Sequence, residues 1–263
     1  MTHDPVREFY DRFSKRLLMD MLVPNRRVLK QFAFVRDATP AAARRVLVVG
    51  VGTGELAHFI ATGVAREAEV VGVDISGENL RLAERLFHHP RVRFERHDIV
   101  ASGPDGPFDV VVFPDSYEHL PAASRARVHG YLATTLASRA RVLLACPTVM
   151  KQAALRVTGG LQVVDEDVTL RDVERLAEDV GGVVTHFSMV QVWATYDYFY
   201  AVVERGVDEL APVRQSGPLP IHRGESPLRT VASMAAGYGG LTQSSRRVAR
   251  VLSAMMRRRR NDV

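Results

Sequence analysis

The chain has 263 residues, of which 46% are hydrophobic and 25% charged, the balance of a globular protein that can bury one large core. It holds no run of 18 apolar residues and no apolar stretch near its N-terminus, so we expect no transmembrane segment, no signal peptide and a cytoplasmic location. A single cysteine, Cys146, excludes an intramolecular disulfide framework.

The net charge of +5 belongs to the C-terminal end of the chain. Between Ser244 and Val263 there are seven arginines and one acid, whereas the rest carries 28 basic and 29 acidic residues. The body therefore lacks a broad basic surface, and nucleic acid is not favoured as a partner. Anionic lipid, a carrier phosphate or RNA stays open for the tail, as does packing against the body or a second subunit in a homo-oligomer.

The chain opens with two helical patterns. Asp4 and Pro5 supply a cap and a first-turn proline for one helix, and Asn25 can cap the next. We assign residues 1–40 to an N-terminal helical cap.

Short apolar runs then alternate with helical patterns. Predicted strands lie at Arg45–Val49, Glu69–Val73, Val92–Arg96, Asp109–Phe113 and Arg141–Ala145, and predicted helices at Glu55–Val64, Glu78–Phe87, Ala123–Leu136 and Thr169–Val180. This alternation indicates an α/β fold with a parallel sheet covered on both faces. Two more predicted strands, Val183–Trp193 and Tyr198–Val203, are too close for a crossover helix, so the sheet should end in an antiparallel hairpin.

A change of composition follows this core. We assign residues 41–205 to the core and 206–263 to a Pro/Gly-rich linker followed by a basic amphipathic helix. Its apolar face comprises Val248, Val251, Leu252 and Met255.

The stretch VLVVGVGTGELAHFI, residues 46–60, carries the main motif. Gly50, Gly52 and Gly54 stand between a predicted strand and a predicted helix, where glycine permits a sharp turn and lets a ligand approach the backbone. A turn that merely needs glycines is an equal explanation of this pattern alone.

Acids at the ends of the next two strands favour a nucleoside ligand. Asp74 stands 24 residues after Gly50, where a carboxylate can accept from both ribose hydroxyls. Asp98 ends the third strand and can receive an adenine amino group, with Ile75 and Ile99 on the two faces of the ring.

Glu55 distinguishes between two nucleoside cofactors. It occupies the position of the third glycine in the dinucleotide fingerprint, where a carboxylate would repel a pyrophosphate. A cofactor with a cationic or zwitterionic end carries no such penalty, so S-adenosylmethionine is favoured over NAD.

Together these motifs resemble the class I S-adenosylmethionine-dependent methyltransferases. The carrying residues are VLVVGVGTG (46–54), VVGVD (70–74), FERHD (94–98) and FDVVVFPDSYEHLP (108–121). The resemblance implies a Rossmann-like seven-stranded methyltransferase sheet over roughly residues 41–205. It further implies that Gly50, Val51 and Gly52 line the methionine side of the cofactor and that Gly54 of the same loop also contacts the cofactor. Asp74 would bind the ribose, Asp98 would lie by adenine and Pro114 near the cofactor backbone.

Val48 departs from this family pattern. Members often carry Asp or Glu at this position, two before the first glycine, to help hold the methionine amino group. The valine predicts weaker cofactor binding or a substitute carboxylate, for which Glu55 is the nearest candidate in sequence.

The segment PDSYEHLP after the fourth strand lies where open α/β sheets place their reaction centre. His119 has the right ordinary pKa to remove a proton from a hydroxyl acceptor, and Glu118 or Asp115 could orient it. A purely structural role for the Glu-His pair is an alternative. A divalent metal held by Asp115, Glu118 and His119 is a less favoured one.

The opening FYDRFSKRLLMDMLVPNRRV, residues 9–28, is similar to methyltransferases found beside or fused to glycosyltransferases. This looser resemblance favours a sugar or glycan hydroxyl as the acceptor. Candidate substrate contacts are Tyr10, which with Phe13 could form a lid, and Tyr117. Aromatic and polar residues suited to a carbohydrate site also occur at Trp193, Tyr196, Asp197 and Tyr198, although packing explains such residues equally well.

The sequence thus predicts an O-methyltransferase acting on a small molecule. An N- or carboxyl-methyltransferase of a specialised metabolite is the alternative within the class, because such acceptors need no strong base. A catalytically silent S-adenosylmethionine-binding protein and an NAD-type oxidoreductase are the alternatives outside it.

Overall fold

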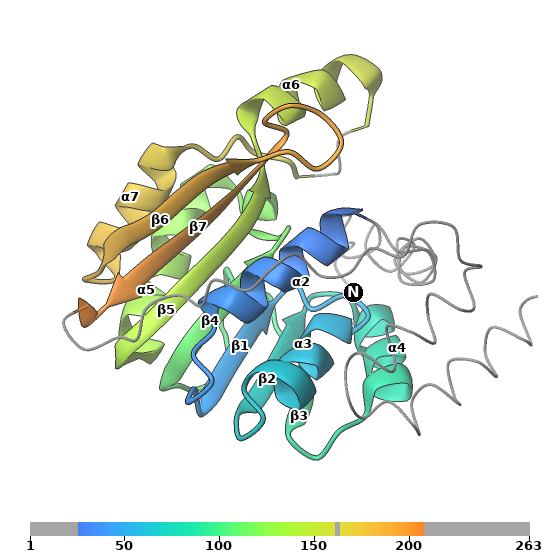
Figure 1. Cartoon of the computed structure of the whole chain (residues 1–263), viewed down its shortest axis with the longest axis vertical. Helices are drawn as coiled ribbons and strands as arrows, with labels where there is room; N and C mark the ends of the chain where they lie inside the picture. Colours follow the sequence, from blue (N-terminus) through green and yellow to red (C-terminus); the bar gives the residue numbers. More distant parts are fainter. Residues whose placement is uncertain (1–25, 161–163, 208–263) are drawn as a thin grey trace, which may run out of the picture.

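A computed structural model describes residues 26–160 and 164–207 (Figure 1). Tyr10, Phe13 and the predicted C-terminal linker and helix lie outside the described residues, as does most of the predicted N-terminal cap. Within the described ranges, no helix is long and apolar enough to cross a membrane.

Seven strands of the described chain form one sheet in the order β3-β2-β1-β4-β5-β7-β6. The strands are β1 (Arg45–Val49), β2 (Glu69–Asp74), β3 (Val92–Arg96), β4 (Phe108–Pro114), β5 (Leu136–Pro147), β6 (Val183–Val190) and β7 (Tyr198–Arg205). Strands β1 to β5 run parallel, and β7 runs antiparallel to both β5 and β6. The predicted mostly parallel sheet with a closing antiparallel hairpin is confirmed.

Helices cover both faces of this sheet (Figure 1). They are α2 (Arg26–Ala38), α3 (Glu55–Phe59) with a π-helical continuation at Ile60–Val64, α4 (Gly77–Phe87), α5 (Arg125–Thr135), α6 (Val149–Thr158) and α7 (Leu170–Asp179). Short 3₁₀ turns occupy Tyr117–His119 and Ala122–Ser124.

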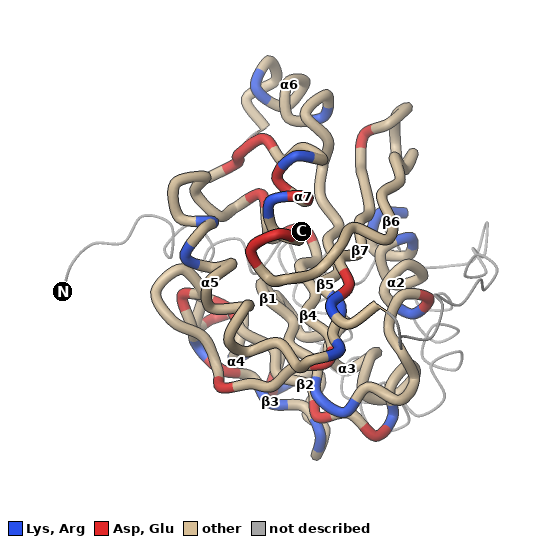
Figure 2. Tube along the Cα trace, turned by 90° about the vertical axis from the view of Figure 1, so that its left-hand side faces the viewer, with Lys and Arg blue, Asp and Glu red and all other residues tan. Residues whose placement is uncertain are grey.

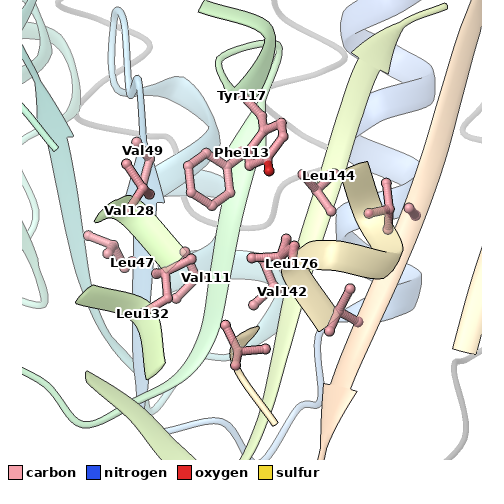
Figure 3. Packing of buried hydrophobic residues seen from close by; sticks show 14 of the residues in the cluster. Leu47, Val49, Val111, Phe113, Tyr117, Val128, Leu132, Val142, Leu144 and Leu176 are labelled. Atoms are coloured by element: carbon pink, nitrogen blue, oxygen red, sulfur yellow. The ribbon is translucent and has the colours of Figure 1, made fainter. Parts of the chain in front are cut away.

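The alternation of side chains along β1 divides the core in two. Val46 and Val48 belong to a cluster with residues of α2, α3 and α4, and Leu47 and Val49 belong to a second cluster with residues of α5 and α7. Figure 3 shows the second cluster, in which side chains of β1, β4 and β5 meet those of α5 and α7. Burial on both faces explains why the central strands read as continuous apolar runs.

The start of β5 at Leu136, the end of β6 and the presence of α6 differ from the sequence prediction. Strand β6 ends at Val190 because the Asp197 carboxylate accepts hydrogen bonds from the backbone N–H groups of residues 192, 193 and 194, at 2.7–3.1 Å, and holds them in a turn. Helix α6, which buries only Gln152, was not predicted. The helix predicted at Thr169–Val180 is observed as α7, which begins with a capping box of Thr169 and Asp172.

A buried ion pair joins β5 to β7 and to the end of α2. The Arg141 side chain is 2% exposed, and its Nε lies 2.8 Å from Oε1 of Glu204, which is 8% exposed. Arg141 also donates from Nη1 to the carbonyl oxygen of Ala38 at 2.8 Å. Removing one partner of such a pair leaves the other charge buried and unpaired, whereas replacing both does not.

We expect Arg141→Met to lower the free energy of unfolding by about 3–5 kcal/mol. The double variant Arg141→Met/Glu204→Met should lose less than the single one, because no buried charge is left behind. Urea unfolding followed by circular dichroism measures both changes. A double variant less stable than Arg141→Met would contradict this account.

Candidate functional site

The predicted site residues gather at the carboxyl edge of the parallel strands. The glycine loop follows β1, Asp74 ends β2, and the segment from Pro114 to His119 ends β4 and continues beyond it. Helix α6 and the loop between β6 and β7 rise from the same edge (Figure 1). Open α/β sheets bind their ligands at this edge.

All three glycines of the loop have positive φ, 74° at Gly50, 55° at Gly52 and 86° at Gly54. A Cβ added to Gly50 would lie 2.6 Å from the Cβ of Ser116, and the Ser116 hydroxyl donates to the carbonyl oxygen of Val49 at 2.6 Å. The turn after β4 therefore packs directly against the loop, so Gly50 is required by the fold as well as suited to a ligand.

Asp74 holds the loop to the following helix. Its carboxylate, 8% exposed, accepts from the N–H of Gly52 at 2.9 Å, from the N–H of Ser76 at 2.9 Å and from the Asn79 side chain at 3.3–3.4 Å. The acid therefore shapes the loop, and ribose hydroxyls would have to join or replace these donors. Ribose binding by Asp74 stays a prediction.

The residues predicted to contact adenine lie in different surroundings. Asp98 is exposed after β3, and its carboxylate accepts from the N–H of Val100 at 3.0 Å. Ile75 is half-buried at the end of β2, whereas Ile99 is 8% exposed and belongs to the core cluster of α5 and α7. This placement does not support the predicted position of Ile99 on one face of an adenine ring.

Val48 is fully buried in the cluster of α2 and α3. An acid at this position would have to point its carboxylate out of the apolar core. Glu55 begins α3 directly after the loop, and burial raises the pKa of its carboxyl to about 7. Near neutral pH this acid is therefore only partly ionised.

The turn after β4 directs its side chains to different surroundings. Asp115 has a φ of 54° and forms an ion pair with Arg27, in the first turn of α2. Glu118 is 2% exposed, and burial raises the pKa of its carboxyl. Within the described residues no group of three or more His, Cys, Asp and Glu side chains is arranged to hold a metal ion.

Tyr117 lies in the core and not at the site (Figure 3). Its ring is fully buried at right angles to Phe113, and its hydroxyl lies 2.7 Å from Nε2 of His129, whose Nδ1 is 2.8 Å from Asp179. The prediction that Tyr117 contacts the substrate conflicts with this placement. The 3₁₀ turn that contains it buries both Tyr117 and Glu118, a property that the local sequence did not reveal.

His119 is held by a segment distant in sequence. Its Nδ1 lies 2.8 Å from the carbonyl oxygen of Val164 and 2.9 Å from Oδ1 of Asp165, whose side chain is 5% exposed. Burial lowers the pKa of His119, but Glu118, Asp165 and the Val164 carbonyl raise it by more, so its pKa is above the ordinary value. The orienting acid is therefore Asp165, and not Glu118 or Asp115 as predicted.

Aromatic side chains are exposed on the loop between β6 and β7. Trp193 is 50% exposed and Tyr196 54% exposed, while Tyr198 is buried. The Lys151 ammonium of α6 lies 5.4 Å from the Trp193 ring centre. Asp197 is a structural residue of this loop, since its carboxylate accepts the three backbone hydrogen bonds described above.

Charge on the described chain is mixed. Figure 2 shows Lys and Arg residues interspersed with Asp and Glu along the described elements. This agrees with the near-neutral body expected from the sequence.

The glycine loop offers a paired test of backbone geometry. We expect Gly50→Ala to lower the free energy of unfolding by at least about 1 kcal/mol, because a left-handed alanine is strained and its Cβ would overlap Ser116. Gly130→Ala, inside α5 with open space around its Cβ, should raise it by about 0.5–1 kcal/mol. Thermal and urea unfolding compare the two, and a Gly50→Ala protein as stable as the parent would contradict the packing described.

Comparisons with known proteins agree with this geometry. Residues 46–139 match a family model described as a methyltransferase domain. A comparison with curated protein sequences finds no match.

Solved structures extend the likeness to the fold. A chain in a complex of the Haloferax volcanii Trm112 methyltransferase activator with a methyltransferase has a TM-score of 0.63 at 14% identity, over 81% of this chain and 100% of that one. An O-methyltransferase from Nostoc punctiforme has a TM-score of 0.57 at 17% identity, over 74% and 60%. Mitomycin 7-O-methyltransferase MmcR has a TM-score of 0.55 at 16% identity, over 68% and 54%. Residues 46–139 therefore match a methyltransferase domain, and the described residues have the fold of these methyltransferase structures.

Proposed function

We propose that this protein transfers a methyl group from S-adenosylmethionine to a hydroxyl of a small molecule, and that the acceptor is a sugar or glycan. The observation that carries the proposal is His119 at the carboxyl edge, oriented through Nδ1 by Asp165 and Val164. An oriented imidazole with a raised pKa suits an acceptor that must lose a proton.

The residues present fit the cofactor. Asp74 and Asp98 offer carboxylates at the ends of neighbouring strands, and the positive φ angles of the loop glycines bring backbone to the same edge. When bound, S-adenosylmethionine supplies an electrophilic methyl group on a positively charged sulfur. Val51, Gly52, Gly54 and Pro114 are proposed to line its binding surface together with Gly50, Asp74, Ile75 and Asp98.

His119 would act as the base. Because its Nδ1 faces two oxygen acceptors, Nδ1 carries the proton and a neutral ring accepts at Nε2. Asp165 stabilises the imidazolium that forms when the acceptor hydroxyl gives up its proton. The buried position of both side chains limits water around them, which strengthens this interaction.

The sugar acceptor is supported by the surface beside this edge. Exposed Trp193 and Tyr196 present rings on which the apolar face of a sugar can stack, with the Lys151 ammonium nearby. Two of the structural neighbours are named as O-methyltransferases. The methyltransferase domain leaves the oxidoreductase alternative without support.

Methyl transfer from labelled S-adenosylmethionine to a panel of sugars, glycosides, phenols, amines and carboxylic acids tests the function. We expect label on a sugar or glycoside, with and without EDTA. Label on amines or carboxylic acids alone would replace the proposal with the N- or carboxyl-methyltransferase. Binding of S-adenosylhomocysteine without transfer to any acceptor would favour a silent binding protein.

The pH dependence of the rate tests the base. Only neutral His119 accepts a proton, so kcat/KM should rise with pH through a pKa above 6.5, and His119→Ala should lower kcat by about 10²–10⁴-fold. Asp165→Asn removes a group that raises this pKa, so the rising limb should move to lower pH. Asp167→Asn is the matched control, because Asp167 is exposed and pairs with Arg156. An unchanged profile in Asp165→Asn would show that His119 is not the titrating base.

A further inference from the structure

The ion pair between Arg27 and Asp115 stands at the edge where the cofactor is proposed to bind. Arg27 comes from the first turn of α2, and Asp115 directly follows β4. The two side chains are only 18% and 14% exposed. The pair therefore joins the N-terminal helix to the turn that also carries His119.

The positions of both Arg27 and Asp115 carry a free-energy cost. Taking two charges largely out of water carries a desolvation penalty that their attraction offsets only in part. Asp115 also adopts a φ of 54°, a conformation that non-glycine residues rarely adopt and that clusters at functional sites.

The packing of α2 does not depend on this pair. The helix buries Leu29, Phe32 and Val35 against the sheet, and Phe32 stacks on Phe59 of α3 with ring centres 5.0 Å apart. Apolar contacts therefore hold the helix in place, and the ion pair at its start is available for another role.

Asp115 is fixed beside the glycine loop. Its N–H donates to the carbonyl oxygen of Ala145 at 2.9 Å, and the next residue, Ser116, contacts both Val49 and Gly50. Asp115 is therefore the direct neighbour in sequence of the residue that contacts the loop after Val48, the position that lacks the acid expected from the resemblance.

Tyr200 gives an independent indication of a ligand on the same face. It lies on β7 with its ring stacked on Phe34 of α2 at 4.7 Å, and it is 6% exposed. Its hydroxyl is buried and, among the described residues, has no hydrogen-bond partner. Burial raises the pKa of Tyr200, and the charge of Arg27 lowers it, so the two groups are close enough to interact electrostatically. A buried hydroxyl without a partner is costly, and an acceptor from a ligand would satisfy it.

The amino-acid end of S-adenosylmethionine matches these groups. It carries an ammonium, which donates hydrogen bonds to carboxylates, and a carboxylate, which accepts from guanidinium and hydroxyl groups. We propose that Asp115 accepts from the ammonium while Arg27 and Tyr200 donate to the carboxylate, so that this pair replaces the acid absent at Val48. The inference rests on the proposed cofactor.

Two ligands distinguish binding of the amino-acid end from binding of the nucleoside. S-adenosylhomocysteine has both parts, whereas 5′-methylthioadenosine has the nucleoside but lacks the amino-acid group. Isothermal titration with each ligand should show that Arg27→Met and Asp115→Asn weaken binding of S-adenosylhomocysteine by about 10–100-fold, the range of a lost charge-assisted hydrogen bond. Binding of 5′-methylthioadenosine should change by less than about threefold, because this ligand lacks the groups that Arg27 and Asp115 would contact.

Matched variants control for folding and for charge. Arg36→Met removes an arginine from the same helix, where Arg36 pairs with neighbouring Asp37, and should change the binding of neither ligand. Arg27→Lys keeps the charge but not the two-pronged geometry, and should fall between Arg27→Met and the parent. Tyr200→Phe removes only the hydroxyl and should weaken S-adenosylhomocysteine alone.

The outcomes are distinguishable. Equal losses for both ligands, or no loss for either, would overturn the assignment of Arg27 and Asp115. A selective loss confined to Glu55→Gln would assign the ammonium to Glu55 instead. If the parent protein binds neither ligand, the proposed cofactor itself is wrong, and this inference is overturned with it.

Discussion

The carboxylate of Asp74 organises the carboxyl edge of the sheet around the glycine loop. It accepts hydrogen bonds from Gly52 in the loop after β1 and from Ser76 and Asn79 at the start of α4. Two βα junctions are thereby tied to one buried charge, and each donor offsets part of the cost of burying it. The loop conformation, with its positive φ angles, follows from this anchor.

The turn after β4 connects that loop to the rest of the edge. On one side Ser116 bonds to Val49 and fills the space beside Gly50. On the other side the carbonyl oxygen of Glu118 accepts from the N–H of Glu166 at 2.9 Å, next to the contact between His119 and Asp165. Beneath the turn, Tyr117 is fixed by its bond to His129. A single short segment thus sets the distance between the glycine loop and the proposed base.

Much of the fold was predictable because parallel strands buried on both faces must be apolar throughout, and glycine loops and capping residues mark where they end. The position of Asp74 and Asp98 at one edge was predictable, because the neighbouring parallel strands β2 and β3 end at the same side of the sheet. Residue roles were harder to predict. Tyr117 and His119 are two positions apart in one turn, yet one side chain faces the core and the other faces Asp165. Sequence spacing alone does not give the rotation of a three-residue 3₁₀ turn.

The sequence by itself determined the α/β class, the antiparallel end of the sheet, the glycine loop and the acids at the strand ends, because these depend on local periodicity and turn chemistry. Only the tertiary structure decided which distant groups meet. Asp165 reaches His119 from 46 positions away, and Arg27 reaches Asp115 across 88. Such pairs leave no local pattern, because the chain between them is folded into strands and helices whose packing alone brings the side chains together.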